Sequence, residues 1–286
     1  MSFQTLINLL RVKQYYKNLL IFLPLIFVKE LTNYDALTRV FIGFITLCLI
    51  SSSNYILNDI FDRKKDKFHP ENKSRPIASG KISPSLAFIF SLALILTALT
   101  LSVSLSFYFS LAIFSLFALT FLYSTLFKKI LFLDIISISV NFVIRPLSGA
   151  LIVYPDHIVR ISPWLILVPF FLSLFLATAK RRSNNLVLKN KTYNPLIEKY
   201  DEKTTSFLFS TSTTLLIISY SLFSFYSDFP ELIITIPIVL YAIFYYAKKV
   251  EEGSIIGRDV FQAFKDRNLI LSMIIWTLTT IIIIYF

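Results

Sequence analysis

Long apolar runs repeated along the whole chain constrain this sequence more than any other feature. Their length matches the roughly 20 residues that an α-helix needs to cross the apolar core of a bilayer. In lipid a spanning segment must satisfy its own backbone hydrogen bonds, which favours helices. The sequence therefore predicts an all-α, polytopic membrane protein with one domain over 1–286 and nine helices. The runs fall at 18–32, 36–57, 85–105, 107–127, 132–153, 162–180, 205–226, 230–247 and 268–286.

Composition agrees with this fold class. The chain is 56% hydrophobic with a mean hydropathy of +0.70, which excludes an ordinary soluble domain. Its single cysteine, Cys48, lies inside an apolar run, so no disulfide framework is expected. The N-terminus lacks the pattern of a cleavable signal peptide, and we expect the first helix to remain in the protein.

The basic residues predict the orientation. With a cytoplasmic N-terminus and nine crossings, the outer segments hold only Lys29, Arg39 and Arg160 of the 28 Lys and Arg residues, and Arg145 falls within a run. Such an excess on one side follows the positive-inside rule and predicts a multi-pass protein of the inner (plasma) membrane. The net charge of +11 then lies mainly on the cytoplasmic face, where it attracts anionic lipid and phosphorylated substrate, with no need of nucleic acid.

A polar stretch from Asn58 to Gly80 directly follows the second run. Its carboxylates Asp59, Asp62 and Asp66 are three and four residues apart, which places them on one helical face. Asn54 and Asn58 continue that face. Oxygen ligands of this kind suit Mg²⁺, which binds one or two carboxylates and completes its shell with water and substrate phosphate. We interpret the stretch as a magnesium and diphosphate site; the alternative is a solvated connector. Basic residues that would face the remaining phosphate charge follow at Lys64, Lys65, Lys67, Lys73 and Arg75.

The pattern N-D-x-x-D-x-x-x-D followed by R-P-I-A-S-G resembles the first signature of the UbiA superfamily of membrane prenyltransferases. Two further segments, 11–25 and 133–150, are similar to its decaprenyl-phosphate phosphoribosyltransferase branch. Members of that branch move phosphoribose from phosphoribosyl diphosphate to a polyprenyl phosphate. The resemblance covers nearly the whole chain. It implies a UbiA-type helix bundle with a central cavity that faces the cytoplasm, and in the first of these segments Lys17 is a further substrate-binding candidate.

Arg145 is a charge within a membrane run. A guanidinium there costs about 2.5 kcal/mol or more, so an intramembrane arginine is a functional candidate. Asp134, Asn141 and Arg145 are seven and four residues apart and share one helical face, which we expect to line the cavity. The alternative is structural: Arg145 extends to the membrane surface or pairs with Asp134.

Tyr123 and Lys128 lie at the end of the fourth run and just beyond it. In the resembled family a Tyr followed by a Lys at this place contacts the diphosphate, and the spacing here matches. Without that resemblance, an aromatic residue followed by a basic one is the ordinary pattern of a membrane interface.

The third cytoplasmic loop departs from the family pattern. Where a second Asp-rich motif is expected, the chain has Lys180, Arg181 and Arg182. A basic cluster binds anions, so we expect it to hold a phosphate group that lacks its own metal. Either the 5-phosphate of phosphoribosyl diphosphate or the head group of a polyprenyl phosphate fits. The alternative is a topology signal only.

The rest of the chain offers little other chemistry. Asp266 and Arg267 resemble a pair in the same branch, but they are also consistent with a helix start. The sequence has no glycine-rich nucleotide motif, zinc-ligand spacing or Ser-His-Asp set, and with only His69 and His157 a histidine-rich metal site is excluded.

These features predict a Mg²⁺-dependent transferase that moves phosphoribose from phosphoribosyl diphosphate to a polyprenyl phosphate. One alternative keeps the metal site and places a prenyl diphosphate in it, to alkylate an aromatic or other acceptor. Another is a polytopic lipid transporter, which would favour charges at the membrane midplane and an internal repeat. The lipid length and the oligomeric state are left open.

Overall fold

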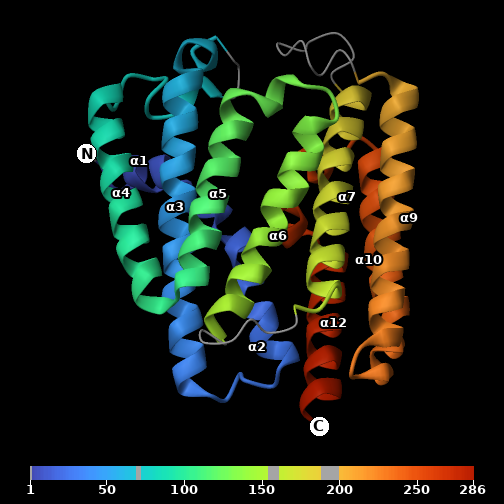
Figure 1. The fold of residues 1–286 in the computed structure, drawn as a ribbon. Coiled ribbons are helices and arrows are strands. Elements are labelled where there is room, and N and C mark those ends of the chain that lie inside the picture. The colour runs from blue at the N-terminus through green and yellow to red at the C-terminus, as the bar shows by residue number, and fades with distance from the viewer. Residues whose placement is uncertain (1, 69–71, 154–160, 188–199) are drawn as a thin grey trace. The chain divides into compact units, whose positions relative to one another are not determined.

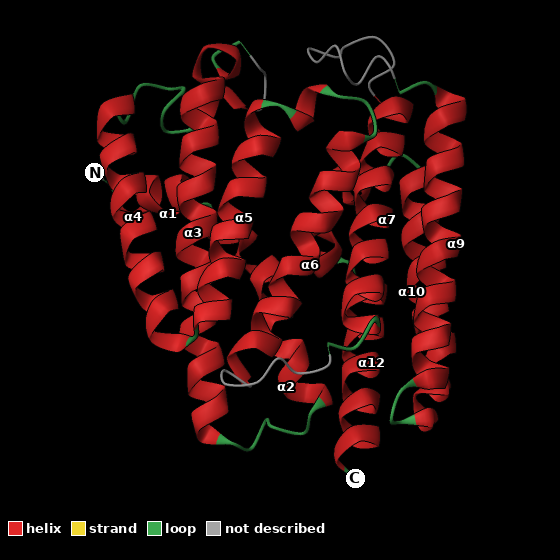
Figure 2. Cartoon of the chain, viewed as in Figure 1, coloured by secondary structure: helices red, strands yellow, loops and turns green. Residues whose placement is uncertain are grey.

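The computed structural model describes residues 2–68, 72–153, 161–187 and 200–286, and within these ranges the chain is helical without strands (Figures 1 and 2). Eight of the described helices are long and apolar enough to cross a membrane, which confirms the all-α fold class. They are formed by α3 (Tyr34–Asp66), α4 (Pro84–Leu105), α5 (Phe107–Thr125), α6 (Leu133–Val153), α7 (Trp164–Val187), α9 (Glu202–Tyr226), α10 (Ile236–Glu251) and α12 (Arg267–Tyr285). The short elements are α1 (Phe3–Leu10), η1 (Val12–Phe22), α2 (Leu23–Phe27), η2 (Asn72–Ser74), η3 (Phe127–Lys129), η4 (Pro230–Thr235), α11 (Ile255–Arg258) and η5 (Val260–Lys265).

Backbone contacts divide the chain into two compact units. Unit 1 comprises 1–127 and 144–161, and unit 2 comprises 128–143 and 162–286. Helix α6 therefore begins in unit 2 and ends in unit 1. Each unit has its own apolar core and its own charged side chains, and each is described separately. A single domain over 1–286 stays a prediction.

Helix α3 is the longest element of unit 1 and carries all three predicted carboxylates. Its N-terminus is capped by Asn33, whose side-chain oxygen accepts hydrogen bonds from the backbone N–H groups of Asp35 and Ala36. The helix has 33 residues and is therefore about 50 Å long, whereas the apolar core of a bilayer is about 30 Å thick. The excess length allows its last turns, with the acidic residues, to extend beyond the lipid.

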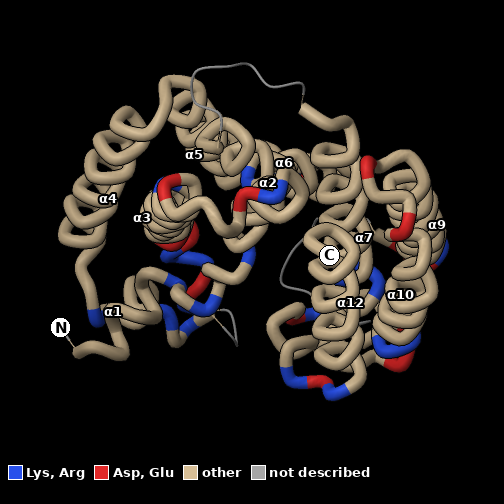
Figure 3. The backbone as a smooth tube through the Cα atoms, turned by 90° about the horizontal axis from the view of Figure 1, so that it is seen from below, with Lys and Arg blue, Asp and Glu red and all other residues tan. Residues whose placement is uncertain are grey.

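Helices α4 and α5 complete the apolar part of unit 1. Ser83 caps α4 by accepting a hydrogen bond from the backbone of Leu86, and the extended Ser106 separates α4 from α5. Neither helix contains a charged residue, as Figure 3 shows. Their outer faces expose large apolar side chains such as Phe88 and Phe114, as expected for contact with lipid. Inward they pack on a core shared with α3 and η1, which includes Ile21, Leu47, Ile50, Phe109, Ile113 and Ile152.

The predicted membrane helix over 18–32 is not observed. This run is divided between the 3₁₀ helix η1 and the five-residue α2, and neither is long enough to be a membrane span. Hence the predicted count of nine helices is not confirmed. Hydrogen bonds from Tyr15 to Ser52 and from Asn18 to Cys48 show that η1 runs antiparallel to α3. Irregular backbone is tolerated at membrane depth where protein buries it.

Gly149 of α6 explains how η1 can pack so closely in unit 1. A Cβ atom at Gly149 would overlap the backbone carbonyl oxygen of Ile21. Only glycine therefore permits this contact between η1 and α6. The polar composition of η1 and its break at Arg11, which has a φ of 52°, favour an irregular segment over a regular helix.

Unit 2 is built on α7 and α9, with α10 packed on both, α11 packed on α7, and α12 packed on α10. Its core includes Phe175, Ala179, Phe209, Leu216, Ile243, Tyr246, Val250 and Leu269. Asp201 caps α9 by accepting a hydrogen bond from the backbone N–H of Thr204 at 2.7 Å. Hydrogen bonds with the side chain and then with the backbone of Thr204 lower the pKa of Asp201. Asp266 caps α12 through the N–H groups of Asn268 and Leu269. The Asp266–Arg267 pair therefore marks a helix start.

Candidate functional site

The acidic end of α3 forms a compact ion-pair cluster in unit 1. Arg75 Nη1 lies 3.1 Å from Asp59 Oδ1 and 2.7 Å from Asp66 Oδ2, so one guanidinium nitrogen bridges two carboxylates. Arg11 Nη2 also donates to Asp59 Oδ1. Both carboxylates are buried, with 2% of Asp59 and 4% of Asp66 exposed. Buried acids need such partners, because an unpaired charge in an apolar setting is costly.

The chain after α3 is folded so that it delivers Arg75 to these acids. Asn72 Nδ2 donates to Asp66 Oδ1 at 3.0 Å, and the backbone of Arg75 donates to the Asn72 carbonyl at 2.9 Å. Ile77 and Ile82 are buried in a small core with Leu9, Ile56 and Ala87. The apolar positions of the 75–82 stretch thus anchor the loop and hold its arginine over the carboxylates.

The donors of this cluster fit a divalent cation in part. Asp59 and Asp66 are close enough to accept from one guanidinium nitrogen of Arg75. Carboxylate oxygens are also the ligands that Mg²⁺ prefers. Within the described residues, however, no group of three or more His, Cys, Asp or Glu side chains is arranged to hold a metal. The structure brings together Asp59 and Asp66, and Asp62, half-buried on the same helix, is not grouped with them. Mg²⁺ needs only one or two carboxylates when substrate phosphate completes its shell, so the pair is sufficient.

Asn54 and Asn58 also lie on α3, as predicted. Asn54 is buried, and its Nδ2 donor has no hydrogen-bond partner in the described part of the chain. An unsatisfied buried donor costs about 1–3 kcal/mol, and a ligand or water that accepts from it would remove this cost. Asn58 is half-buried. The polar face of α3 therefore has spare donor capacity next to its acidic end.

Arg145 lies in the half of α6 that belongs to unit 1 and is 6% exposed. Its Nε donates to Asn18 Oδ1 of η1 at 2.9 Å, and Asn18 Nδ2 donates to Cys48 Sγ at 3.3 Å. The alternative in which Arg145 pairs with Asp134 is wrong, because Asp134 forms its ion pair with Arg181 in unit 2. The preceding residue of η1, Lys17, is half-buried.

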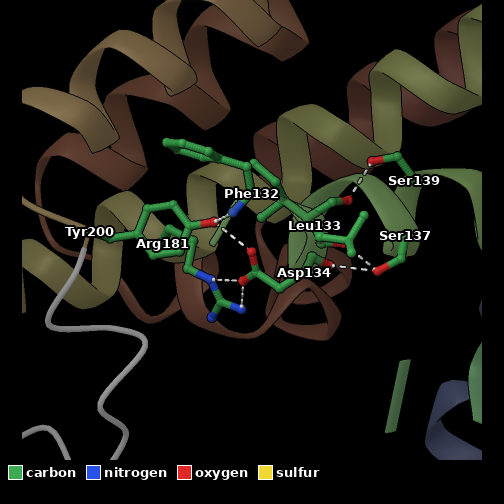
Figure 4. A network of polar contacts seen from close by, with 8 residues as sticks. Phe132, Leu133, Asp134, Ser137, Ser139, Arg181 and Tyr200 are labelled. Atoms are coloured by element: carbon green, nitrogen blue, oxygen red, sulfur yellow. Dashed lines mark hydrogen bonds and ion pairs between the residues drawn. The ribbon is translucent and has the colours of Figure 1, made fainter. Parts of the chain in front are cut away.

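A second polar network lies in unit 2 and is shown in Figure 4. Asp134, in the first turn of α6, is fully buried. Arg181 of α7 donates to Asp134 Oδ2 from Nε at 3.1 Å and from Nη2 at 2.7 Å. Tyr200, just before α9, donates its hydroxyl proton to Asp134 Oδ1 at 2.5 Å. Burial and the adjacent Asp134 carboxylate raise the pKa of Tyr200, which keeps its hydroxyl protonated.

The basic cluster at the end of α7 is divided between different surroundings. Arg182 is buried and forms a two-pronged ion pair with Glu251 of α10, with both N–O distances at 2.9 Å. It is therefore a structural link between helices rather than an anion ligand. Lys180 is exposed and Arg181 is half-buried. The predicted phosphate site is reduced to Lys180 and Arg181.

The remaining candidates are divided between the units. In unit 1, Tyr123 of α5 is half-buried and Lys73 of η2 is exposed. In unit 2, Lys128 of η3 and Asn141 of α6 are half-buried. Their roles in a site stay predictions.

Sequence reasoning did not select Arg11, Asn18 or Tyr200 as site residues. The first two lie in the N-terminal segment that carries the family resemblance, and this was the available signal. Tyr200 belongs to a polar stretch of sequence with no recognisable pattern, and only the fold brings it to Asp134.

Comparison with known proteins defines the class. The model of the UbiA prenyltransferase family matches residues 19–262, so the chain belongs to this family. The decaprenyl-phosphate phosphoribosyltransferase of Mycolicibacterium smegmatis is 30% identical over 98% of this chain and 92% of its own length. The protein of the same name from Mycobacterium tuberculosis is 28% identical over 96% of this chain and 92% of its own length. The fold matches a UbiA homologue from Archaeoglobus fulgidus bound to GPP and Mg²⁺, with a TM-score of 0.73, 16% identity and coverage of 97% and 99%. The chain is thus a multi-pass integral membrane transferase of the UbiA type.

Proposed function

We propose that this protein transfers 5-phosphoribose from phosphoribosyl diphosphate to a polyprenyl phosphate, with Mg²⁺ as cofactor and diphosphate as the second product. The observation that carries the proposal is the similarity along nearly the full chain to relatives named decaprenyl-phosphate phosphoribosyltransferase. One feature of each unit supports it. Unit 1 has a buried carboxylate pair that already binds a cationic group, and unit 2 has an oriented arginine suited to phosphate.

In this proposal Asp59 and Asp66 would hold Mg²⁺, with Asp62 as a further candidate ligand on the same helix. The ion would neutralise charge on the diphosphate leaving group. Arg11 and Arg75 have side chains that are 22% and 26% exposed at the carboxylates. Their guanidinium groups can donate to diphosphate oxygens once these approach the acidic end of α3. The unsatisfied amide donor of Asn54 can do the same.

The reaction needs no strong base from the protein. The bond between the anomeric carbon and the diphosphate oxygen breaks, and its electron pair leaves with diphosphate. The oxocarbenium-like ribose is attacked by a phosphate oxygen of the lipid, which forms the new C–O bond. A phosphate monoester has a second pKa of about 6, so this oxygen is already anionic at neutral pH. The protein contributes positioning and electrostatic stabilisation.

Further residues bind the phosphorylated substrates in this proposal. Tyr123 and Lys128 contact the diphosphate, and Lys180 and Arg181 bind a phosphate monoester. Arg145 and Asn141 line the cavity that admits the lipid. The other proposed substrate-binding residues are Lys17, Asn58 and Lys73.

We also propose a cytoplasmic N-terminus in the inner membrane. The antiparallel course of η1 along α3 supports this, because η1 starts at the acidic end of α3 and runs toward the other end of that helix. The chain's N-terminus is therefore on the same side as the acidic end of α3. The 58–81 and 180–203 segments then face the cytoplasm, where a water-soluble donor is available.

Prenyl transfer is the second candidate. The A. fulgidus homologue of the same fold was solved with GPP and Mg²⁺, so this fold accommodates a prenyl diphosphate. The basic residues at the end of α7 favour the first proposal, because they supply a cationic site for a phosphate group without metal.

Turnover by the purified protein tests the proposal. With labelled phosphoribosyl diphosphate, a polyprenyl phosphate and Mg²⁺, we expect label to enter the lipid fraction and diphosphate to be released. Asp59→Asn should abolish this product. Asp35→Asn, an exposed acid at the opposite end of the same helix, is the matched control and should leave it unchanged. Label that stays in the aqueous phase with the wild-type protein would refute the proposal.

A further inference from the structure

The contacts around Asp134 satisfy its buried carboxylate and also restrict the orientation of Arg181. A fully buried carboxylate must have partners, and Arg181 and Tyr200 supply them. The same contacts also restrict the arginine. With Nε and Nη2 both bonded to one carboxylate oxygen, the plane of the guanidinium is set, because its donors form a rigid fork.

Tyr200 stabilises this arrangement from several sides. The Arg181 guanidinium carbon lies 5.7 Å from the centre of the Tyr200 ring. Asn185, one turn after Arg181 on α7, donates to the Tyr200 carbonyl oxygen at 2.7 Å. The backbone N–H of Phe132 donates to the Tyr200 hydroxyl at 3.1 Å. Phe132 has a φ of 66°, a left-handed conformation that a bulky residue adopts only when its surroundings enforce it.

The outer edge of Arg181 is not used by the described part of the chain. Its hydrogen bonds there come from Nε and Nη2, which leaves the Nη1 donors for another group. The side chain is 13% exposed, and Nη1 is not among the fully buried polar atoms that lack a partner, so Nη1 retains some contact with solvent. The adjacent Lys180 is exposed. Arginine with one edge fixed by a carboxylate can present its other edge to phosphate, and charge-assisted bonds of this kind are strong and directional.

We infer that Asp134 and Tyr200 are positioning residues that hold Arg181 so that its Nη1 edge binds a phosphate monoester. The inference rests on the proposed function and deepens it, because it names the chemical group that Arg181 recognises and the residues that orient it. The monoester is either the 5-phosphate of phosphoribosyl diphosphate or the head group of the lipid phosphate. Neither Asp134 nor Tyr200 touches the substrate in this inference.

Direct binding to the detergent-purified protein tests it, with three ligands. Phosphoribosyl diphosphate carries a monoester and a diphosphate, farnesyl phosphate carries the monoester only, and inorganic diphosphate with Mg²⁺ carries no monoester. Asp134→Asn should raise the Kd of at least one monoester ligand about tenfold or more, and Tyr200→Phe should raise it several-fold, on the order expected for a misplaced charge-assisted bond. The Kd of diphosphate should not change. Loss for only one of the two monoester ligands identifies which phosphate Arg181 binds.

Controls separate positioning from general damage. Glu251→Gln breaks the neighbouring Arg182 ion pair and should leave all three affinities unchanged. Arg181→Lys keeps the charge but cannot serve Asp134 and phosphate with one fork, so it should match Asp134→Asn. Thermal unfolding shows which variants are folded, and Tyr200→Phe, which keeps the ring, decides the question if Asp134→Asn fails to fold.

The outcomes are distinct. Unchanged monoester affinity in folded Tyr200→Phe and Arg181→Lys, or an equal loss for all three ligands, overturns the positioning role while the proposed function stands. Wild-type protein that binds farnesyl phosphate but not phosphoribosyl diphosphate overturns the proposed donor. In that case a loss of farnesyl phosphate binding in the variants still supports the positioning role.

Discussion

Replacement of Arg75 by glutamine tests whether the carboxylate pair on α3 is built for a cation. Arg75 supplies two charge-assisted hydrogen bonds, at 3.1 Å to Asp59 and at 2.7 Å to Asp66. Each such bond contributes about 1.5–3 kcal/mol. Because the Arg75 side chain is 26% exposed, solvent screens its charge, and the lower end of this energy range applies to each bond. We therefore expect Arg75→Gln to lower the free energy of unfolding by about 3 kcal/mol when no divalent ion is present.

Added Mg²⁺ should reverse much of this loss. Without Arg75, the two buried acids repel each other, and a divalent ion that binds the folded state stabilises it by mass action. In the wild-type protein the ion must compete with the guanidinium, so its effect is smaller. Thermal unfolding in detergent with EDTA and with Mg²⁺ measures both the destabilisation by Arg75→Gln and the stabilisation by the ion. In EDTA the melting temperature of the variant should be roughly 5–10 °C below that of the wild type.

Arg182→Gln is the matched control, because it removes a buried arginine from an ion pair in unit 2 whose acid, Glu251, is exposed. It should lower stability equally with and without Mg²⁺. The reasoning is refuted if Arg75→Gln is as stable as wild type in EDTA, or if Mg²⁺ raises both melting temperatures by the same amount.

Four further predictions address other parts of the account. Asp59→Asn should abolish turnover of a protein that remains folded, and full activity of the wild-type protein in EDTA would contradict the metal site. In a background without the native cysteine, single cysteines placed in the 58–81 and 180–203 segments should both react with an impermeant thiol reagent from the same side; labelling from opposite sides would overturn the topology. Gly149→Val should lower the melting temperature markedly, because its side chain would overlap the Ile21 carbonyl, and normal stability would show that η1 can move away from α6. The raised pKa of Tyr200 implies stability that is fully present below pH 10 and is lost as the pH rises further, so unfolding measured between pH 9 and pH 11 should show a smaller loss in Tyr200→Phe than in wild type.

The long helices could be predicted from the sequence because each buries or exposes apolar side chains over a full membrane thickness. The proximity of Asp59 and Asp66 on α3 was also predictable, since residues seven apart share one face of a helix. Asp62, on the same helix, is not grouped with them. The run at 18–32 was misjudged for a physical reason. Its apolar residues suggest a helix, but Arg11 is left-handed, Asn18 bonds to α3, and the close contact with Gly149 fixes an irregular path.

The partners of the charges could not be predicted. Asp134 and Arg145 share a helical face, yet Asp134 pairs with Arg181 and Arg145 bonds to Asn18. Both partners are distant in sequence, and only the packing of the helices brings them near. Arg182, next to Arg181, turns to Glu251 because adjacent residues on a helix point in different directions. Charge composition therefore located the basic cluster but did not assign its members.

The identity of the donor distinguishes phosphoribosyl transfer from prenyl transfer by this protein. One preparation of wild-type protein is divided between labelled phosphoribosyl diphosphate with a polyprenyl phosphate and labelled prenyl diphosphate with an aromatic acid, each with Mg²⁺, and the initial rate of product formation is measured in both. We expect a labelled phosphoribosyl lipid in the first reaction and no product in the second. A prenylated aromatic acid in the second reaction, with no labelled lipid in the first, would contradict it.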